Sequence, residues 1–349
     1  MDRTYGLLIV DDSSLFRNCL KRMVGDEPGL RVVGEAENGE KALAMIPELS
    51  PDVVVLDVNM PVMDGLTALK HIMIRSPTPT VMFSALTKAG ARTTFEALKF
   101  GAVDFIQKPS SMTEEALADQ KAGILRKIGL AAGVRVGKIR CLRSSPPGRT
   151  RGAPGGEKPE YVFGIGAAEG GMGSLLRIAP GLSPDLPAAF LVVLHEEPGH
   201  VDAFAEYLGQ YCRIRVRRAR HGDFLEKGAM YLASGREYLT LVGSRSRRGF
   251  ALHLSQAPFA GRRGSVNMLL FSLAEAMETR AVGVLLSGAG EDGTEGLAEI
   301  ARRGGVSLVQ DPASCLCEEM VRSALVRAGV HFVYADTEMS GKINQNFDQ

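Results

Sequence analysis

Short apolar runs alternate with helix-like patterns over the first third of the chain. Their continuous hydrophobic character is typical of strands that are buried on both faces of a parallel sheet. Apolar positions at helical spacing predict helices over Leu15–Met23 and Gly39–Ile46. The expected strands are Leu7–Val10, Arg31–Ala36, Val53–Leu56, Thr80–Phe83 and Val103–Ile106. This alternation predicts an α/β fold with a doubly wound parallel sheet.

The same pattern starts again after residue 160. Apolar runs beginning at Val162, Ala189 and Ala281 have the character of buried parallel strands. Between the two halves, a helical pattern continues to about Leu130, and Lys and Arg are then interleaved with Pro-Pro-Gly and Pro-Gly-Gly, which predicts a flexible basic linker. We therefore expect two doubly wound parallel-sheet domains, over residues 1–125 and 161–345, joined by a helix and this linker over residues 126–160.

Composition narrows the class of protein. The 349 residues are 45% hydrophobic and 23% charged, which is typical of soluble globular domains. A formal net charge of +1 gives no overall field that would attract nucleic acid or acidic lipid. The start has no basic and apolar leader, no apolar run is long enough to span a bilayer, and the 5 cysteines are irregularly spaced. We expect a cytoplasmic protein without membrane insertion and without a nucleic-acid partner.

Carboxylates gather where two of the predicted strands end. Asp11 and Asp12 follow the first strand, and Asp57 follows Val53–Leu56. Because the carboxyl ends of parallel strands meet at one edge, these like charges need a cation, and oxygen ligands of this kind favour Mg²⁺. A simpler interpretation is that the acidic residues cap helices. That interpretation accounts for Asp11 or Asp12 but leaves Asp57 unexplained.

A hydroxyl and an ammonium group are expected at the same edge. Ser84 follows the strand at Thr80–Phe83, and Lys108 follows the strand at Val103–Ile106. Together with Asp57 before Met-Pro-Val-Met-Asp-Gly, these residues fall in an order that resembles the two-component response-regulator receiver domain, over about residues 5–110.

The resemblance implies a flavodoxin-like fold in which Asp57 accepts a phosphoryl group from a histidine kinase. It assigns Mg²⁺ to Asp12, Asp57 and the carbonyl group of Asn59, with Asp11 nearby. The residues that it assigns to sensing the phosphate are Ser84, Lys108 and, as an aromatic switch, Phe105.

The second domain opens on a strand that breaks into glycines, Val162 to Gly171. Such a turn can cradle phosphate, present a nucleophile or simply allow close packing. The spacing of its glycines misses the dinucleotide fingerprint by one residue. His195 follows the strand at Ala189–Leu194, and Asp292 lies in Gly-Ala-Gly-Glu-Asp-Gly after the strand at Ala281–Leu286. A histidine and an aspartate at neighbouring strand ends could form the base and orienting carboxylate of a hydrolase.

These residues resemble the catalytic domain of the chemotaxis protein-glutamate methylesterase. Further matches are Tyr231-Leu232-Ala233 and Ser265-Val266. The resemblance implies a receiver-controlled enzyme that hydrolyses methyl esters of chemoreceptor glutamates with a Ser-His-Asp triad, in which His195 is the base and Asp292 its orienting partner.

The nucleophile of that triad is missing. The family's loop reads Ile-Gly-Ala-Ser-Thr-Gly-Gly, and Ala168 and Glu169 stand here at the serine and threonine positions. A methyl group cannot attack an ester, and a carboxylate at residue 169 would repel a developing oxyanion. Two hypotheses remain open: a catalytically impaired protein that binds a chemoreceptor or another protein, and a working methylesterase or glutamine deamidase that uses Glu169 or another group.

Overall fold

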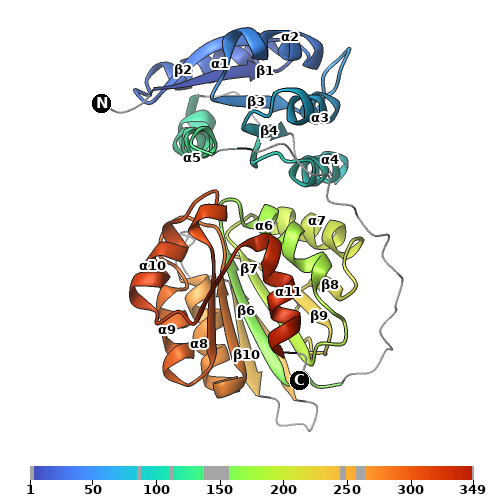
Figure 1. The fold of residues 1–349 in the computed structure, drawn as a ribbon, viewed down its shortest axis with the longest axis vertical. Coiled ribbons are helices and arrows are strands. Elements are labelled where there is room, and N and C mark those ends of the chain that lie inside the picture. Colours follow the sequence, from blue (N-terminus) through green and yellow to red (C-terminus); the bar gives the residue numbers. More distant parts are fainter. Residues whose placement is uncertain are drawn as a thin grey trace. The chain divides into compact units, whose positions relative to one another are not determined.

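The computed structural model describes residues 4–84, 88–109, 114–134, 136, 157–243, 249–256 and 264–347 (Figure 1). Contacts between residues divide the chain into two compact units, Met1–Arg143 and Ser144–Gln349. We call them the receiver unit and the effector unit. Most of the linker expected over residues 126–160 lies outside the described residues.

The receiver unit is built on one parallel sheet with the strand order β2-β1-β3-β4-β5. This order is that of a flavodoxin-like doubly wound fold. Its strands are β1 (Tyr5–Val10), β2 (Leu30–Ala36), β3 (Val53–Asp57), β4 (Thr80–Ser84) and β5 (Asp104–Gln107). Its helices are α1 (Ser14–Gly25), α2 (Gly39–Leu49), α3 (Gly65–Arg75), α4 (Lys88–Lys99) and α5 (Glu114–Ala132).

Local sequence explains where these helices begin and end. Ser13 precedes α1 and its hydroxyl accepts a hydrogen bond from the Phe16 N–H group, so that Ser13, and neither Asp11 nor Asp12, is the N-cap. Helix α5 continues past residue 125, where the sequence ended the receiver domain, because Ile128 and Ala131 remain buried in the receiver core. The exact domain limits stay a proposal.

The effector unit has a seven-stranded parallel sheet with the order β14-β13-β12-β6-β7-β9-β8, and a separate antiparallel pair, β10-β11. Its strands are β6 (Tyr161–Ala167), β7 (Ala188–Leu194), β8 (Arg215–Arg218), β9 (Ala229–Ser234), β10 (Glu237–Gly243), β11 (Phe250–Gln256), β12 (Ala281–Leu285), β13 (Val306–Gln310) and β14 (Phe332–Tyr334). Its α-helices are α6 (Gly171–Ile178), α7 (Pro198–Gly209), α8 (Ser265–Met277), α9 (Thr294–Arg302), α10 (Glu319–Arg327) and α11 (Asp336–Phe347). Short 3₁₀ turns are η1 (Ala179–Gly181), η2 (Glu278–Arg280) and η3 (Pro312–Ser314).

The direction in which successive strands are added to this parallel sheet changes at β6. After β6 it runs to β7 on one side, and it later returns to β12 on the other side. Helices α8, α9 and α10 cover one face of the sheet, and α6, α7 and α11 cover the other (Figure 1). The carboxyl edge beside such a reversal is where α/β proteins place their functional groups. Both expected doubly wound parallel sheets are thus confirmed.

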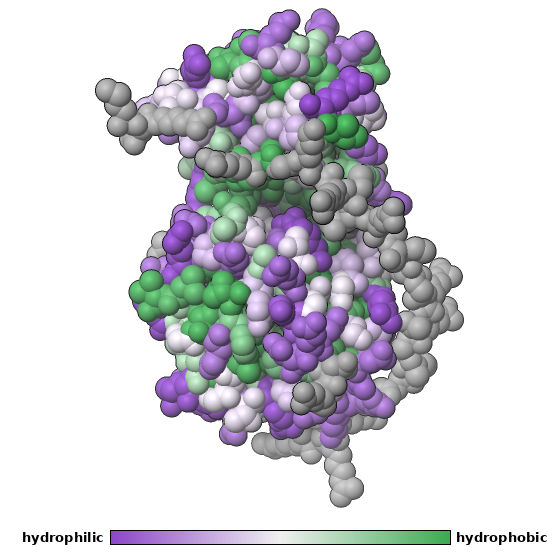
Figure 2. Space-filling view, viewed as in Figure 1, coloured by the Kyte–Doolittle hydropathy of each residue, from purple (hydrophilic) through white to green (hydrophobic). Residues whose placement is uncertain are grey.

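The surface of the effector unit is mixed in polarity. Figure 2 shows a hydrophobic area over α10. Exposed apolar side chains of α10 and β14 are Leu325, Val326, Phe332 and Val333. Within the described part of the chain, no helix is long and apolar enough to cross a membrane.

Candidate functional site

An acidic cluster lies at the carboxyl ends of β1 and β3. Carboxylate oxygens of Asp11, Asp12 and Asp57 all lie within 4.8 Å of one another. Lys108, which follows β5, places its Nζ 2.7 Å from Asp11 Oδ2 and 2.9 Å from Asp57 Oδ1. Among the described residues, this is the one group of acidic, histidine or cysteine side chains close enough to share a metal ion. The structure therefore brings the predicted carboxylates and the predicted lysine together.

Burial sets the electrostatics of this cluster. It raises the pKa of the Asp57 carboxyl above its ordinary value, and the hydrogen bond and charge of Lys108 offset only part of that effect. The nearby Asp11 carboxylate raises this pKa further. A second cation would relieve the repulsion, and an all-oxygen donor set of this charge fits Mg²⁺.

The segment after Asp57 folds back onto the Asp57 backbone. Asp64 caps α3 by accepting a hydrogen bond from the Thr67 N–H group at 2.8 Å. Gly65 approaches so closely that a Cβ there would lie 1.9 Å from the Asp57 carbonyl oxygen. The Asp-Gly pair of the Met-Pro-Val-Met-Asp-Gly motif thus has a structural role, because it allows α3 to start directly beside Asp57.

Three further residues that the resemblance assigns lie on β4, in the loop after β3 and on β5. Ser84 ends β4, is fully buried, and its carbonyl oxygen accepts the Lys108 N–H group at 2.8 Å. Asn59 is exposed in the loop after β3. The Phe105 ring is buried in β5, with its centroid 6.3 Å from that of Phe95.

In the effector unit, the glycine-rich strand β6 presents residues 168 and 169 at the carboxyl edge of the sheet. Helix α8 lies so close that a Cβ at Gly166 would be 2.2 Å from Val266 Cγ1. Gly170 has a φ of +79°, a left-handed conformation that lets the chain turn at once into α6. Glycine thus serves close packing within the strand and a sharp turn at its end.

His195 and Asp292 meet beside this turn, as the sequence predicts. His195 Nε2 lies 3.0 Å from Asp292 Oδ2, and both side chains are buried. Burial alone would raise the pKa of the Asp292 carboxyl, but hydrogen bonds from His195 and from the Asn267 and Val266 N–H groups outweigh it and lower that pKa. Gly235 lies against the imidazole, because a Cβ there would be 2.6 Å from His195 Cδ2. The arrangement is that of an oriented base.

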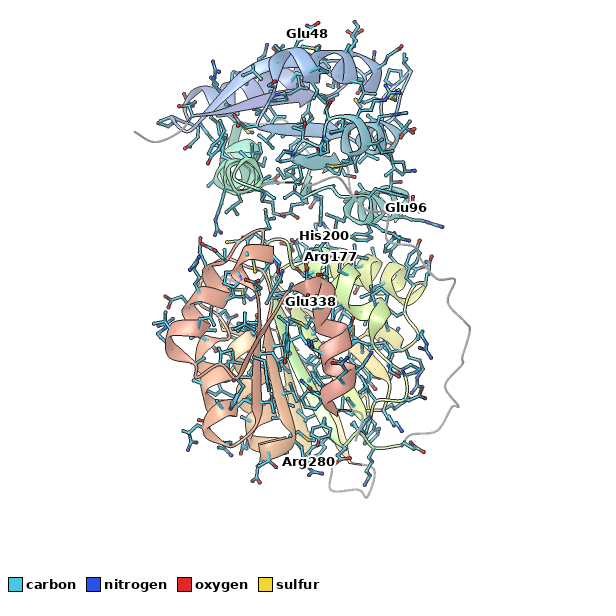
Figure 3. All side chains as sticks on the ribbon, in the orientation of Figure 1. Glu48, Glu96, Arg177, His200, Arg280 and Glu338 are labelled. Carbon is cyan, nitrogen blue, oxygen red and sulfur yellow. The ribbon has the colours of Figure 1, made fainter. Side chains whose placement is uncertain are left out.

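Labelled side chains mark the two ends of the effector unit. Figure 3 shows His200, on α7 just after β7, at the opposite end of the unit from Arg280, which directly precedes β12. The residue 168 turn and His195 follow β6 and β7 in the same direction, so they lie at the His200 end.

Comparisons with known proteins agree with this architecture. The family model for the CheB methylesterase matches residues 163–343, and that for the response regulator receiver domain matches residues 7–118. The chain belongs to the CheB methylesterase family. It is 36% identical over 344 residues to a protein-glutamate methylesterase/protein-glutamine glutaminase of Caldanaerobacter subterraneus. The alignment covers 95% of this chain and 94% of that protein.

Two further CheB relatives give the same result. A protein of the same printed name from Pyrococcus horikoshii is 36% identical over 335 residues, covering 95% of this chain and 91% of that protein. The crystal structure of the Thermotoga maritima CheB methylesterase catalytic domain is 26% identical with a TM-score of 0.50, covering 54% of this chain and 99% of that chain. A receiver domain and a CheB-type α/β domain are therefore combined in one chain.

Two features of this CheB-type site escaped the sequence analysis. Ser265 Oγ lies 3.2 Å from His195 Nε2 and is fully buried. Asp292 also caps α8, because Oδ2 and Oδ1 accept the Val266 and Asn267 N–H groups, each at 3.0 Å. One sequence feature indicated that α8 needs a distant cap, because its N-cap residue Gly264 has no side chain that could accept the N–H groups of the first turn. Its distant partner could not be named without the fold.

Proposed function

We propose that this chain is a phosphorylation-controlled response regulator of chemotaxis type whose effector unit is impaired as a methylesterase and acts by binding a protein. The observation that carries the proposal is Ala168 at the position of the family's serine, beside an intact His195–Asp292 pair. In the triad reaction, serine Oγ bonds to the ester carbonyl carbon, its proton passes to the histidine, and methanol leaves with that proton. Removing the serine of such a triad costs about 10⁶-fold in turnover.

Four other candidate nucleophiles of the effector unit are unsuited to attack an ester. Ser265 Oγ, which lies 3.2 Å from His195 Nε2, is fully buried. Ser174 is buried in α6, and its Oγ lies 2.9 Å from Gln310 Oε1 in the interior. Ser287 Oγ donates to the Glu169 carbonyl oxygen at 2.6 Å. Burial first, and then nearby carboxylates, raise the pKa of the Cys315 thiol to about 12, which disfavours the reactive thiolate. These contacts support the loss of nucleophilic catalysis.

The alternative is an active methylesterase or glutaminase in which Glu169 activates water. The printed names of the relatives favour it. Against it, Glu169 Oε2 already accepts a hydrogen bond from the Ala289 N–H group at 3.0 Å. A water-activating role would therefore fall to its second carboxylate oxygen, Oε1.

In this proposal, phosphorylation of the receiver unit controls the effector unit. Asp57 would take a phosphoryl group from a histidine kinase, and Asp11, Asp12, Asp57 and the Asn59 carbonyl group would hold Mg²⁺, which supplies positive charge to the phosphoryl oxygens. Lys108 already contacts Asp57 and would pair with the new anion, which Ser84 would hydrogen-bond. Phe105 would respond as the aromatic switch. Methyl-accepting chemoreceptors are the partners that we propose, from the resemblance to the chemotaxis protein-glutamate methylesterases.

Methanol release tests the proposal. The full-length protein, treated with acetyl phosphate and Mg²⁺, is added to membranes that carry methylated chemoreceptors, with an active serine-containing relative as the positive control. We expect no methanol above background and measurable co-sedimentation with the membranes. Release by the unaltered protein would contradict the proposal. Release that is lost in Glu169→Gln and persists in His195→Ala would establish the water-activating alternative.

A further inference from the structure

The loop after β12 carries two successive amide groups that each bind a carboxylate. The Ala289 N–H group donates to Glu169 Oε2 at 3.0 Å, and the Gly290 N–H group donates to Glu319 Oε2 at 2.8 Å. Gly290 has a φ of +82°. Successive N–H groups in a turn of this kind form a concave site for anions. In this chain its own two carboxylates fill that site.

This amide site adjoins the position of the missing nucleophile. A Cβ at Gly288 would lie only 2.8 Å from Ala168 Cβ. The Ala168 N–H group is itself bound to the Ser287 carbonyl oxygen at 3.0 Å, so it is not available to a ligand. An acyl group attached at residue 168 would therefore have the Ala289 N–H group as its neighbouring donor.

Glu169 is held in this place from two directions. Its backbone carbonyl oxygen accepts the buried Ser287 hydroxyl at 2.6 Å, while its side chain reaches the Ala289 amide. Two anchors limit the freedom of the side chain to leave when a ligand arrives.

We infer that the Glu169 carboxylate occupies the place where the carbonyl oxygen of a bound ester would lie. The effector unit therefore cannot hold a substrate carbonyl while Glu169 is there. The inference rests on the proposed function, because it concerns the same site. An ester carbonyl oxygen becomes an oxyanion when a nucleophile attacks, and it then needs a donor without a competing anion. Glu169 both takes the donor and adds a like charge. A serine restored at residue 168 therefore does not restore catalysis while Glu169 is present.

Paired variants of the full-length protein test this inference. Ala168→Ser, Ala168→Ser/Glu169→Thr and the control Ala168→Ser/Glu275→Gln are phosphorylated and assayed for methanol release from methylated chemoreceptor membranes. Glu275 is an exposed carboxylate on α8. Because one oxyanion donor is worth about 10²-fold or more in turnover, we expect Ala168→Ser/Glu169→Thr to exceed Ala168→Ser by about that factor. The control should equal Ala168→Ser. Equal rates in Ala168→Ser and Ala168→Ser/Glu169→Thr, at any level, overturn the inference.

A second measurement needs no activity. In amide proton–nitrogen NMR spectra, Glu169→Thr should shift the Ala289 signal, because the amide loses its carboxylate acceptor. Glu275→Gln should leave the Ala289 signal in place. An Ala289 signal that ignores Glu169→Thr would overturn the inference. Methanol release by the unaltered protein would instead contradict the proposed function, so the two failures are distinguishable.

Discussion

Asp292 is predicted to stabilise the effector unit independently of any reaction. Its carboxylate accepts hydrogen bonds from His195 Nε2 and from the Val266 and Asn267 N–H groups, each at 3.0 Å. Asp292→Asn keeps the size and one acceptor oxygen, but its NH₂ group then faces a donor. A buried donor without an acceptor costs about 1–3 kcal/mol, and loss of a helix cap costs about 1 kcal/mol. We expect a loss of about 2 kcal/mol.

Hydrogen exchange at the start of α8 measures this effect directly. A loss of about 2 kcal/mol corresponds to opening that is about 30-fold more frequent, so the Val266 and Asn267 amides should exchange faster by about that factor. Asp185→Asn is the matched control, because Asp185 is exposed in the loop before β7. Unchanged exchange at these two amides in Asp292→Asn would refute the capping role.

The lowered pKa of Asp292 fixes how this contribution depends on pH. A carboxyl group whose pKa is lower in the folded state stabilises the fold above its unfolded pKa, about 3.9 for aspartate, and loses that contribution as the pH falls through the folded pKa. The difference between the unaltered protein and Asp292→Asn should therefore shrink as the pH falls below about 4. A difference that persists unchanged well below about pH 4 would contradict this reasoning.

Two predictions concern the receiver unit. Asp57→Asn should abolish labelling of the protein by radioactive acetyl phosphate in the presence of Mg²⁺, and a chelator should do the same. The control Asp26→Asn should keep the label. Label retained in Asp57→Asn would rule out Asp57 as the acceptor. Gly65→Ala should destabilise the receiver unit by about 3 kcal/mol in calorimetry, because its Cβ would lie 1.9 Å from the Asp57 carbonyl oxygen. Gly123→Ala, with open space around it, should not destabilise, and equal melting of both variants would contradict the close approach.

The positions of the candidate site residues were predictable because buried parallel strands have a distinctive sequence pattern. Continuous apolar runs identified β1, β3, β7 and β12, and parallel strands present their carboxyl ends at one edge. That rule places Asp57 with Asp11, and His195 with Asp292, from the sequence alone. The distances of 3.0 Å between His195 and Asp292 and 4.8 Å or less within the acidic cluster agree with it.

The detailed contacts of the loops that follow the strands were not predictable. The bond between Glu169 and Ala289 spans 120 residues, and nothing near either residue indicates the other. Strand β14 has only three residues and is largely exposed, so its pattern is too short and too weak to identify a strand. By contrast, the helical pattern that continues to about Leu130 anticipated the end of α5 at Ala132.

The double role of Asp292 changes what the intact His195–Asp292 pair means for function. In a working triad, both residues are retained for the reaction. Here the Asp292 carboxylate also holds the first turn of α8, and α8 packs against β6 so closely that Gly166 has no room for a side chain. Losing Asp292 would disturb the strand that carries residue 168 even in a protein without esterase activity. The pair is therefore compatible with an inactive effector unit, and the evidence on catalysis rests on residues 168 and 169.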